Sequence, residues 1–194
     1  MKADIEKIIV ELVQKYLDLP DNYGLDKNDN VIPCVVIKSQ NIKLFNTPKL
    51  QITIATLSSN VYANRKEYKD IKDDTTGVVG LAETVRMNES RIMQIDAYSR
   101  NNEARERLSE LQMALSSTLA EQLQDQHQFK IGKISRAINT SGLDGGSDVN
   151  RYTIRFNVIT WHEKTKEVEY FDKFKVGVYD EKKEIFEIEQ NAQN

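Results

Sequence analysis

Apolar residues recur at steps of three and four along residues 102–124, and this is the strongest periodic pattern in the chain. Such a stripe is typical of a helix with one buried face. Its members are Ala104, Leu108, Leu111, Leu115 and Leu119. A short apolar run at Arg91–Tyr98 precedes it and has the length of a strand. We predict that this strand and a helix at about Asn102–Gln124 pack together and organise the fold.

A second amphipathic pattern begins directly after Asp4 and ends before Pro20. Its apolar positions are Ile5, Ile8, Ile9, Leu12, Val13, Tyr16 and Leu17. The Asp4 carboxylate can accept a hydrogen bond from the first helical turn, and Pro20 stops a helix. We therefore predict a first helix here. The Asn, Asp and Gly residues at 21–30 favour turns and predict an exposed loop.

Short runs rich in β-branched residues predict strands in the first half of the chain. One run lies at Gln51–Leu57. Two further runs, Val78–Met87 and Arg91–Tyr98, are separated by Asn88 and Glu89. A two-residue connection of this kind predicts an antiparallel hairpin.

The second half of the chain adds candidate strands after the long helix. Residues 129–138 form one, and from Tyr152 to Val158 apolar and polar residues alternate without interruption. Alternation of this kind indicates a half-buried antiparallel strand. We expect residues 162–167 to form a turn, and a last strand at about Glu169–Val178 to pair with the alternating one.

Polar segments separate these elements. Residues 60–77 are densely charged and predict a solvent-facing loop or hairpin tip, residues 140–150 are rich in turn residues, and residues 187–194 predict a flexible tail. The whole chain, 1–194, is predicted to be a single domain. Its fold class is α+β, with a mainly antiparallel sheet and two helices packed on one face.

Composition limits the classes of function. Apolar residues make up 39% and charged residues 29% of the chain, so much of it should be exposed. A net charge of −3, with 27 basic and 30 acidic residues intermixed, disfavours sequence-specific nucleic-acid binding. The N-terminus lacks the continuous apolar run of a signal peptide, and no run is long enough to span a membrane. We expect a soluble, intracellular protein.

Candidate chemistry is sparse. His127, His162 and Cys34 are the only residues of their types and are far apart in sequence, so a zinc site would need carboxylates from across the fold. Cys34 with either histidine could form a nucleophilic pair, but no neighbouring residue indicates an activated thiol. An inert buried cysteine and two surface histidines are favoured. We predict no metal and no cofactor.

Two other motifs are weak. Metal-dependent nucleases combine a Pro-Asp with an acid-x-Lys on a strand, and Asp21, Glu67 and Lys69 fit this order. Such triplets are common by chance in a chain with 30 acidic residues, and none lies on a strand expected to be buried. The glycine-rich segment 142–147 lacks the Lys and Ser or Thr of a phosphate-binding loop, so a hairpin loop is favoured.

Asp96 is the most unusual acid in the pattern, because it lies within the apolar strand RIMQIDAY. A charge near a core usually has a partner. The alternative is that Asp96 lies at the strand end and caps toward Ser99 or the start of the following helix.

The segments RIMQIDAYSRNNEARERLSELQMAL and RYTIRFNVITW make the chain resemble the tail terminator or neck terminator proteins of long-tailed bacteriophages. That family has a strand of the form apolar-Gln-apolar-Asp-Ala-Tyr leading into a helix with an early Glu-Ala. Residues 93–98 and Glu103-Ala104 match it, and the N-terminal helix also fits.

The resemblance implies a structural virion protein of the tail neck, assembled in the host cytoplasm, and not an enzyme. It implies a ring of identical subunits, usually six, that caps the last ring of the major tail tube protein and presents a surface to the head–tail connector or head-completion protein. DNA would pass through the lumen as non-specific cargo, and no membrane is involved. Polar loops would make the subunit or tube contacts, through Arg65, Lys66, Glu67, Lys69, Asp70, Asp144 and Asp148.

Two alternatives stay open. A head-completion or tail-completion adaptor of the neck would be a similar small α+β protein. From a different class, a small metal-dependent nuclease would use some of Asp21, Glu67 and Lys69.

Overall fold

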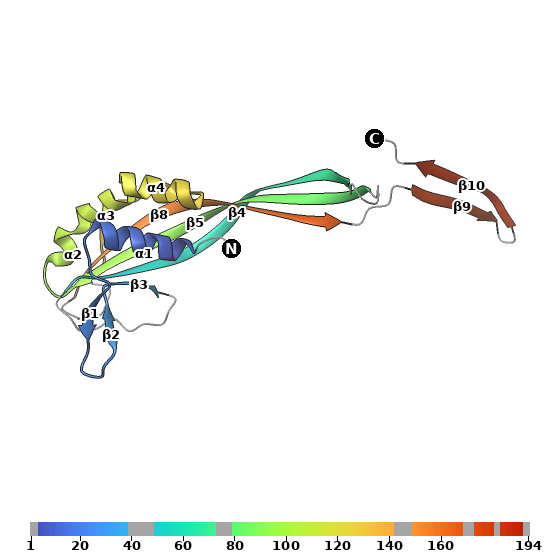
Figure 1. The fold of residues 1–194 in the computed structure, drawn as a ribbon. Helices are drawn as coiled ribbons and strands as arrows, with labels where there is room; N and C mark the ends of the chain where they lie inside the picture. The colour runs from blue at the N-terminus through green and yellow to red at the C-terminus, as the bar shows by residue number, and fades with distance from the viewer. Residues whose placement is uncertain are drawn as a thin grey trace. The chain divides into compact units, whose positions relative to one another are not determined.

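The computed structural model describes residues 4–38, 49–72, 79–141, 149–168, 173–180 and 183–191 (Figure 1). Helices lie before and between the strands, and most of the described strand pairs are antiparallel. The predicted α+β class is therefore confirmed. The backbone divides into two compact units, Met1–Ala63 with Met87–His162, and Asn64–Arg86 with Glu163–Asn194. The expectation of a single domain stays a prediction.

The first helix, α1, spans Ile5–Tyr16, as its pattern predicts. The Asp4 side chain caps it by accepting a hydrogen bond from the Glu6 backbone N–H at 3.1 Å. The stripe of Ile and Leu residues on α1 is buried in the core. The chain leaves the helix through Asp18, whose φ of 50° lies in the left-handed region.

The second predicted helix is interrupted into α2 (Glu103–Glu106), α3 (Leu108–Leu115) and α4 (Thr118–His127), so the prediction of two helices is corrected. The Ser117 hydroxyl donates to the Ala114 carbonyl at 2.8 Å and accepts from the Ala120 N–H at 3.1 Å. Serine side chains compete with the helical backbone in this way. The break at Ser117 therefore ends one helix and caps the next.

The main sheet has the strand order β3-β4-β5-β8-β6, with β7 beside β8. The bounds are β3 Val35–Ile37, β4 Gln51–Lys72, β5 Val79–Ser99, β6 Phe129–Ile134, β7 Ile138–Asn139 and β8 Asn150–Val168. β3 runs parallel to β4, whereas β6 and β7 run antiparallel to β8. The strand predicted at Gln51–Leu57 is confirmed as the first part of β4.

One face of the sheet in the first unit carries the core. The helices cover this face (Figure 1). The buried core residues of the strands include Met93, Ile95, Ile154, Phe156 and Val158. Because side chains alternate along a strand, the residues between them face the opposite side of the sheet. This opposite side carries the polar network described below.

β5 is continuous, so the predicted hairpin at Asn88 and Glu89 is wrong. Glu89 looks like a turn residue in the sequence, but its carboxylate is buried and is bonded by Arg91 at 2.8 Å. β8 likewise continues through residues 162–167, where a turn was predicted. There the Thr165 hydroxyl lies 2.9 Å from that of Thr84 on β5. Cross-strand partners satisfy polar residues that would otherwise favour turns.

The predicted charged loop at 60–77 is wrong for residues 60–72, which belong to β4. Residues 73–78 lie outside the described part of the chain. The charges are compatible with a strand because they pair with one another, as the Lys66–Glu83 ion pair at 2.9 Å illustrates.

Residues 21–30 also differ from the predicted loop. They contain β1 (Asn22–Leu25), which pairs antiparallel with β2 (Val31–Pro33). The Asp26 carboxylate accepts hydrogen bonds from the backbone N–H groups of Asn28 and Asn30, at 2.7 and 2.9 Å. These bonds lower the pKa of Asp26 and close the tight turn between the strands.

The C-terminal predictions are wrong in their pairing. β9 (Lys173–Asp180) pairs with β10 (Lys183–Asn191) in a two-stranded antiparallel sheet, and not with β8. Residues 187–191 of the predicted flexible tail therefore form a strand, and 192–194 lie outside the described residues. The charged residues of this segment alternate with apolar ones, which is compatible with a strand.

Candidate functional site

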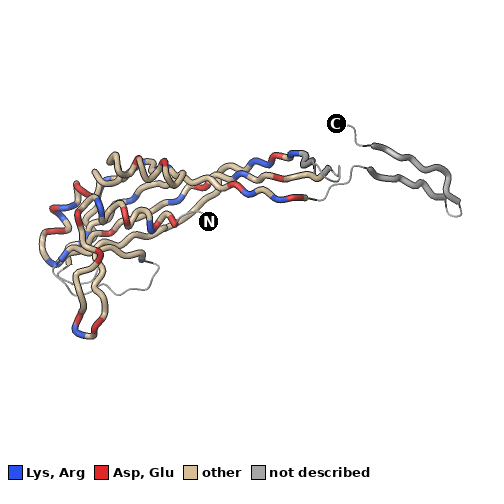
Figure 2. The backbone as a smooth tube through the Cα atoms, in the orientation of Figure 1, with Lys and Arg blue, Asp and Glu red and all other residues tan. Residues whose placement is uncertain are grey.

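The predicted contact residues Arg65, Lys66 and Glu67 lie on β4 in the second unit. Basic and acidic residues are intermixed along this part of the sheet (Figure 2). Glu67 is bonded by Arg65 at 3.1 Å and by Arg86 of β5 at 3.2 Å. Arg86 also donates to Glu163 of β8 at 2.7 Å. One arginine thus links all three strands of this part of the sheet.

A second cross-strand cluster centres on Glu83 of β5. Its carboxylate pairs with Lys66 at 2.9 Å and accepts from the Tyr68 hydroxyl at 3.1 Å. The Lys66 ammonium lowers the pKa of Glu83, and Glu83 in turn raises the pKa of Lys66. Lys66 and Tyr68 are exposed and Glu83 is half-buried, so these pairs near the surface fix geometry more than they add stability.

The remaining predicted contact residues divide into two groups. Lys69 is exposed on β4, and Asp70 lies on the same strand. Asp144 and Asp148 lie outside the described residues. The structure therefore gathers five of the seven predicted residues on one strand, and their role in contacts stays a prediction.

Asp96 is the best-connected carboxylate of the first unit. It is only 1% exposed, on the face of the sheet opposite the core. Its oxygens accept hydrogen bonds from the Gln94 amide at 2.8 and 3.0 Å, from the Thr153 hydroxyl, and from Arg151 at 3.2 Å. The Lys38 ammonium lies 4.0 Å away. Asp96 is therefore a partnered buried charge, as one of the two readings of the sequence predicted.

The capping alternative for Asp96 is wrong, because Ser99 makes the cap itself. The Ser99 hydroxyl accepts a hydrogen bond from the Ala104 N–H at 2.9 Å and donates to the Asn101 carbonyl at 2.6 Å. Glu103 in α2 accepts from the Leu50 N–H at 3.1 Å, which joins the helix start to β4. The family-like residues 93–98 thus lie on β5, and Glu103-Ala104 lie at the start of α2, which Glu103 tethers to the start of β4.

Glu89 anchors a second polar cluster on the core side of β5 and β8. Its carboxylate is bonded by Arg91 at 2.8 Å and lies 2.9 Å from His162 Nε2 and 3.4 Å from the Thr160 hydroxyl. The hydrogen bond from Arg91 is the largest cause that lowers the pKa of Glu89 to about 2, with Ser59 and His162 contributing. Sequence reasoning missed this cluster, although Glu89 and Arg91 share the alternation of the buried strand positions.

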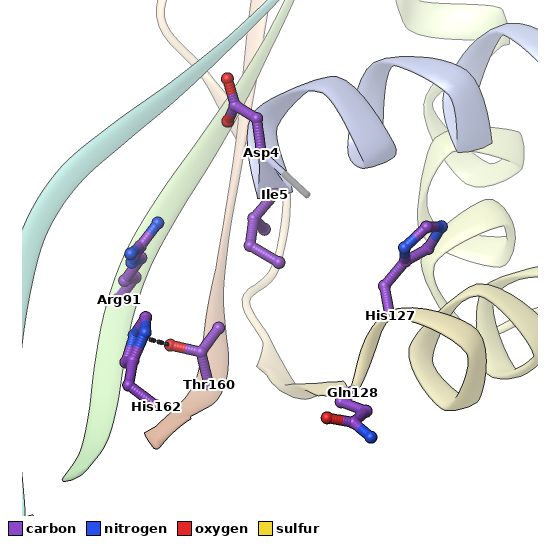
Figure 3. A pocket seen from close by; sticks show the side chains of 7 residues that line it. All are labelled: Asp4, Ile5, Arg91, His127, Gln128, Thr160 and His162. Carbon is purple, nitrogen blue, oxygen red and sulfur yellow. Dashed lines mark hydrogen bonds between the residues drawn. The ribbon is translucent and has the colours of Figure 1, made fainter. Parts of the chain in front are cut away.

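A cavity of about 270 Å³ adjoins this cluster (Figure 3). Its lining comes from the start of α1, the end of α4, and β5 and β8: Asp4, Ile5, His127, Gln128, Arg91, Thr160 and His162. Figure 3 shows His127 and His162 on different walls. Arg91 and His162 are both engaged by Glu89, which explains their placement without a ligand.

The residues of the catalytic alternatives are not assembled into a reactive site in the described chain. Cys34 is fully buried, and burial raises the pKa of its thiol, which disfavours the reactive thiolate. Among the residues that the structure describes, no three His, Cys, Asp or Glu side chains are grouped as metal ligands. Glu67 is held by two arginines.

The chain matches the sequence model of the family described as phage neck terminator protein over residues 3–182. The chain belongs to this family. The resemblance seen in the strand and helix at 91–123 is therefore confirmed. As a member of the phage neck terminator family, the protein is a structural bacteriophage neck protein. No curated protein matches the sequence. None of the described helices is long and apolar enough to cross a membrane.

Proposed function

We propose that this neck terminator caps the end of the phage tail tube, stops its polymerisation and joins the tail to the head connector. It would act as a ring of identical subunits, six by analogy with the family. Heterologous contacts between identical subunits form a ring when the rotation from one subunit to the next closes. The mechanism is stoichiometric binding. One side of the ring copies the surface of a tube subunit, and the other lacks the surface that recruits another ring.

The observation that carries this proposal is the family match over residues 3–182, which covers both units except for the last strand. Strand edges support it. The outer edge of β4 beyond Ile54 has no partner strand among the described residues. Such an edge is suited to pairing with another chain.

The partners follow from the same proposal. They are other copies of the chain, the major tail tube protein and a head–tail connector or head-completion protein, with the contacts on β4 at Arg65, Lys66, Glu67, Lys69 and Asp70 and on the segment holding Asp144 and Asp148. We place the protein in the virion neck after assembly in the host cytoplasm, as one folded domain without metal or cofactor. Its slight acidic excess lets DNA pass through the ring without sticking.

Electron microscopy of tubes incubated with gold-labelled protein tests the location. We expect label at one end of each tube and none along its side. Label along the whole tube, or at the capsid alone, would contradict terminal binding. Label on connector-bearing capsids without any on tubes would instead favour a head-completion adaptor.

A further inference from the structure

We propose that β10 of one copy adds as a strand to the outer edge of β4 of a neighbouring copy. The contact involves Asn64–Lys72 of β4 and rests on the proposed ring. This proposal names the two strands that meet, and the contact includes the five predicted contact residues that lie on β4.

The first step concerns the free edge. β3 covers β4 only from Ile52 to Ile54, and the described strands leave the outer side of β4 unpaired from there to Lys72. Unpaired backbone N–H and C=O groups on a strand edge can accept an added strand, which is a common mode of peptide recognition.

The second step concerns the C-terminal hairpin. Within the described residues, β9 and β10 pair only with each other. A two-stranded ribbon is marginally stable in water and gains stability when a third strand joins it. β10 has nine residues, and Asn64–Lys72 offers a stretch of the same length.

The third step is charge complementarity. Residues 64–72 carry four basic and two acidic residues, a net charge of +2. β10 carries one basic and three acidic residues, a net charge of −2. The β8 stretch 163–168 is neutral, with two residues of each sign. β10 therefore fits the β4 edge better than the β8 edge. The lysines of β4 also discourage pairing with a second β4 strand.

Two charge-reversed chains test the proposal. One carries Glu184→Lys, Glu187→Lys and Glu189→Lys in β10, and the other carries Arg65→Glu, Lys69→Glu and Lys72→Glu in β4. Assembly is measured by analytical ultracentrifugation and mass photometry. Each charge-reversed chain, studied alone, should assemble at least roughly tenfold more weakly than wild type, because like charges on β10 and β4 then face each other. An equimolar mixture should assemble again, because the reversed β10 of one chain can meet the reversed β4 of the other, and their two unreversed strands can meet in the same way.

Matched controls separate this effect from net charge and misfolding. Glu106→Lys, Glu121→Lys and Asp125→Lys on the helices make the same charge change as the β10 variant and should assemble like wild type. The matched control for the β4 variant carries Lys7→Glu, Lys15→Glu and Arg105→Glu, and it should also assemble like wild type. Circular dichroism and thermal unfolding establish that every chain is folded.

Four results would overturn the proposal. Either reversed chain could assemble like wild type, or could lose no more assembly than its matched control. The mixture could stay dissociated, or the wild-type chain could be monomeric at every concentration. Recovery in one doubly reversed chain but not in the mixture would place the contact within a single copy. Tube capping is measured separately, so capping by a monomer would reject this contact and retain the proposed function.

Discussion

At the residue scale, two buried carboxylates distinguish this fold from a generic strand and helix. Asp96 and Glu89 both lie on β5, on opposite faces, and each is held by an arginine. The sequence indicated a partner for Asp96, since an acid within an apolar strand needs one. It could not identify Thr153 or Arg151, because the register of β5 against β8 depends on the whole sheet. For the same reason, the sequence pattern predicts a turn at Glu89, where the structure has a continuous strand.

Glu89 should make stability depend on pH. Its folded pKa of about 2 lies below the ordinary 4.5, so its stabilisation is complete above pH 4.5 and is lost as pH falls toward 2. A depression of this size corresponds to at most about 3 kcal/mol. Glu89→Gln should lower the free energy of unfolding at pH 7 and flatten its fall between pH 4.5 and 2. Urea unfolding at several pH values across this range measures the free energy of unfolding, and the exposed Glu121→Gln is the control. If the free energy of unfolding falls with pH in the same way in Glu89→Gln and in wild type, Glu89 is not the source of the pH dependence.

Asp96→Ala should remove the buried carboxylate to which the half-buried Arg151 donates a hydrogen bond at 3.2 Å. The loss of one partner of a buried pair costs about 3 kcal/mol or more. Adding Arg151→Met should recover part of that cost, which a double-mutant cycle in urea measures. Asp125→Ala, at an exposed ion pair, should cost little. Equal effects of the Asp96 and Asp125 substitutions would show that the Asp96 network is not stabilising.

At the element scale, sequence patterns succeeded where one face is apolar and one end is capped. α1 follows its stripe from Asp4, and the alternating residues 152–158 lie within β8. Patterns failed where polar residues are satisfied across strands. The charged stretch after Leu57 and residues 162–167 continue β4 and β8, since their partners stand on neighbouring strands at positions far away in sequence.

Ser117 gives the helix break a measurable consequence. Ser117→Ala removes the side chain that accepts from the Ala120 N–H, and loss of such a cap costs about 1 kcal/mol. Amide hydrogen exchange in α4 should become faster by the factor that corresponds to this loss of free energy. Ser116→Ala, at the exposed neighbour, is the control and should change stability by less. Equal exchange rates in the two variants would show that the cap does not stabilise α4.

At the scale of the whole molecule, the family match and the strand edges point to assembly with other chains. Composition predicted extensive exposed surface, and the family-like residues 93–98 predicted the family. The hairpin of β9 and β10 could not be predicted, because its apolar and charged residues fit pairing with β8 as well as pairing with each other. Only the backbone arrangement distinguishes the two.

If the protein ends tail-tube growth as proposed, the length of growing tubes is the most direct test. Purified major tail tube protein is allowed to polymerise, and this chain is added during elongation while tube lengths are followed by electron microscopy. We predict that elongation stops once there is enough protein for one ring per tube end, and that excess protein has no further effect. Tubes that continue to elongate at the rate of the untreated control would contradict the account.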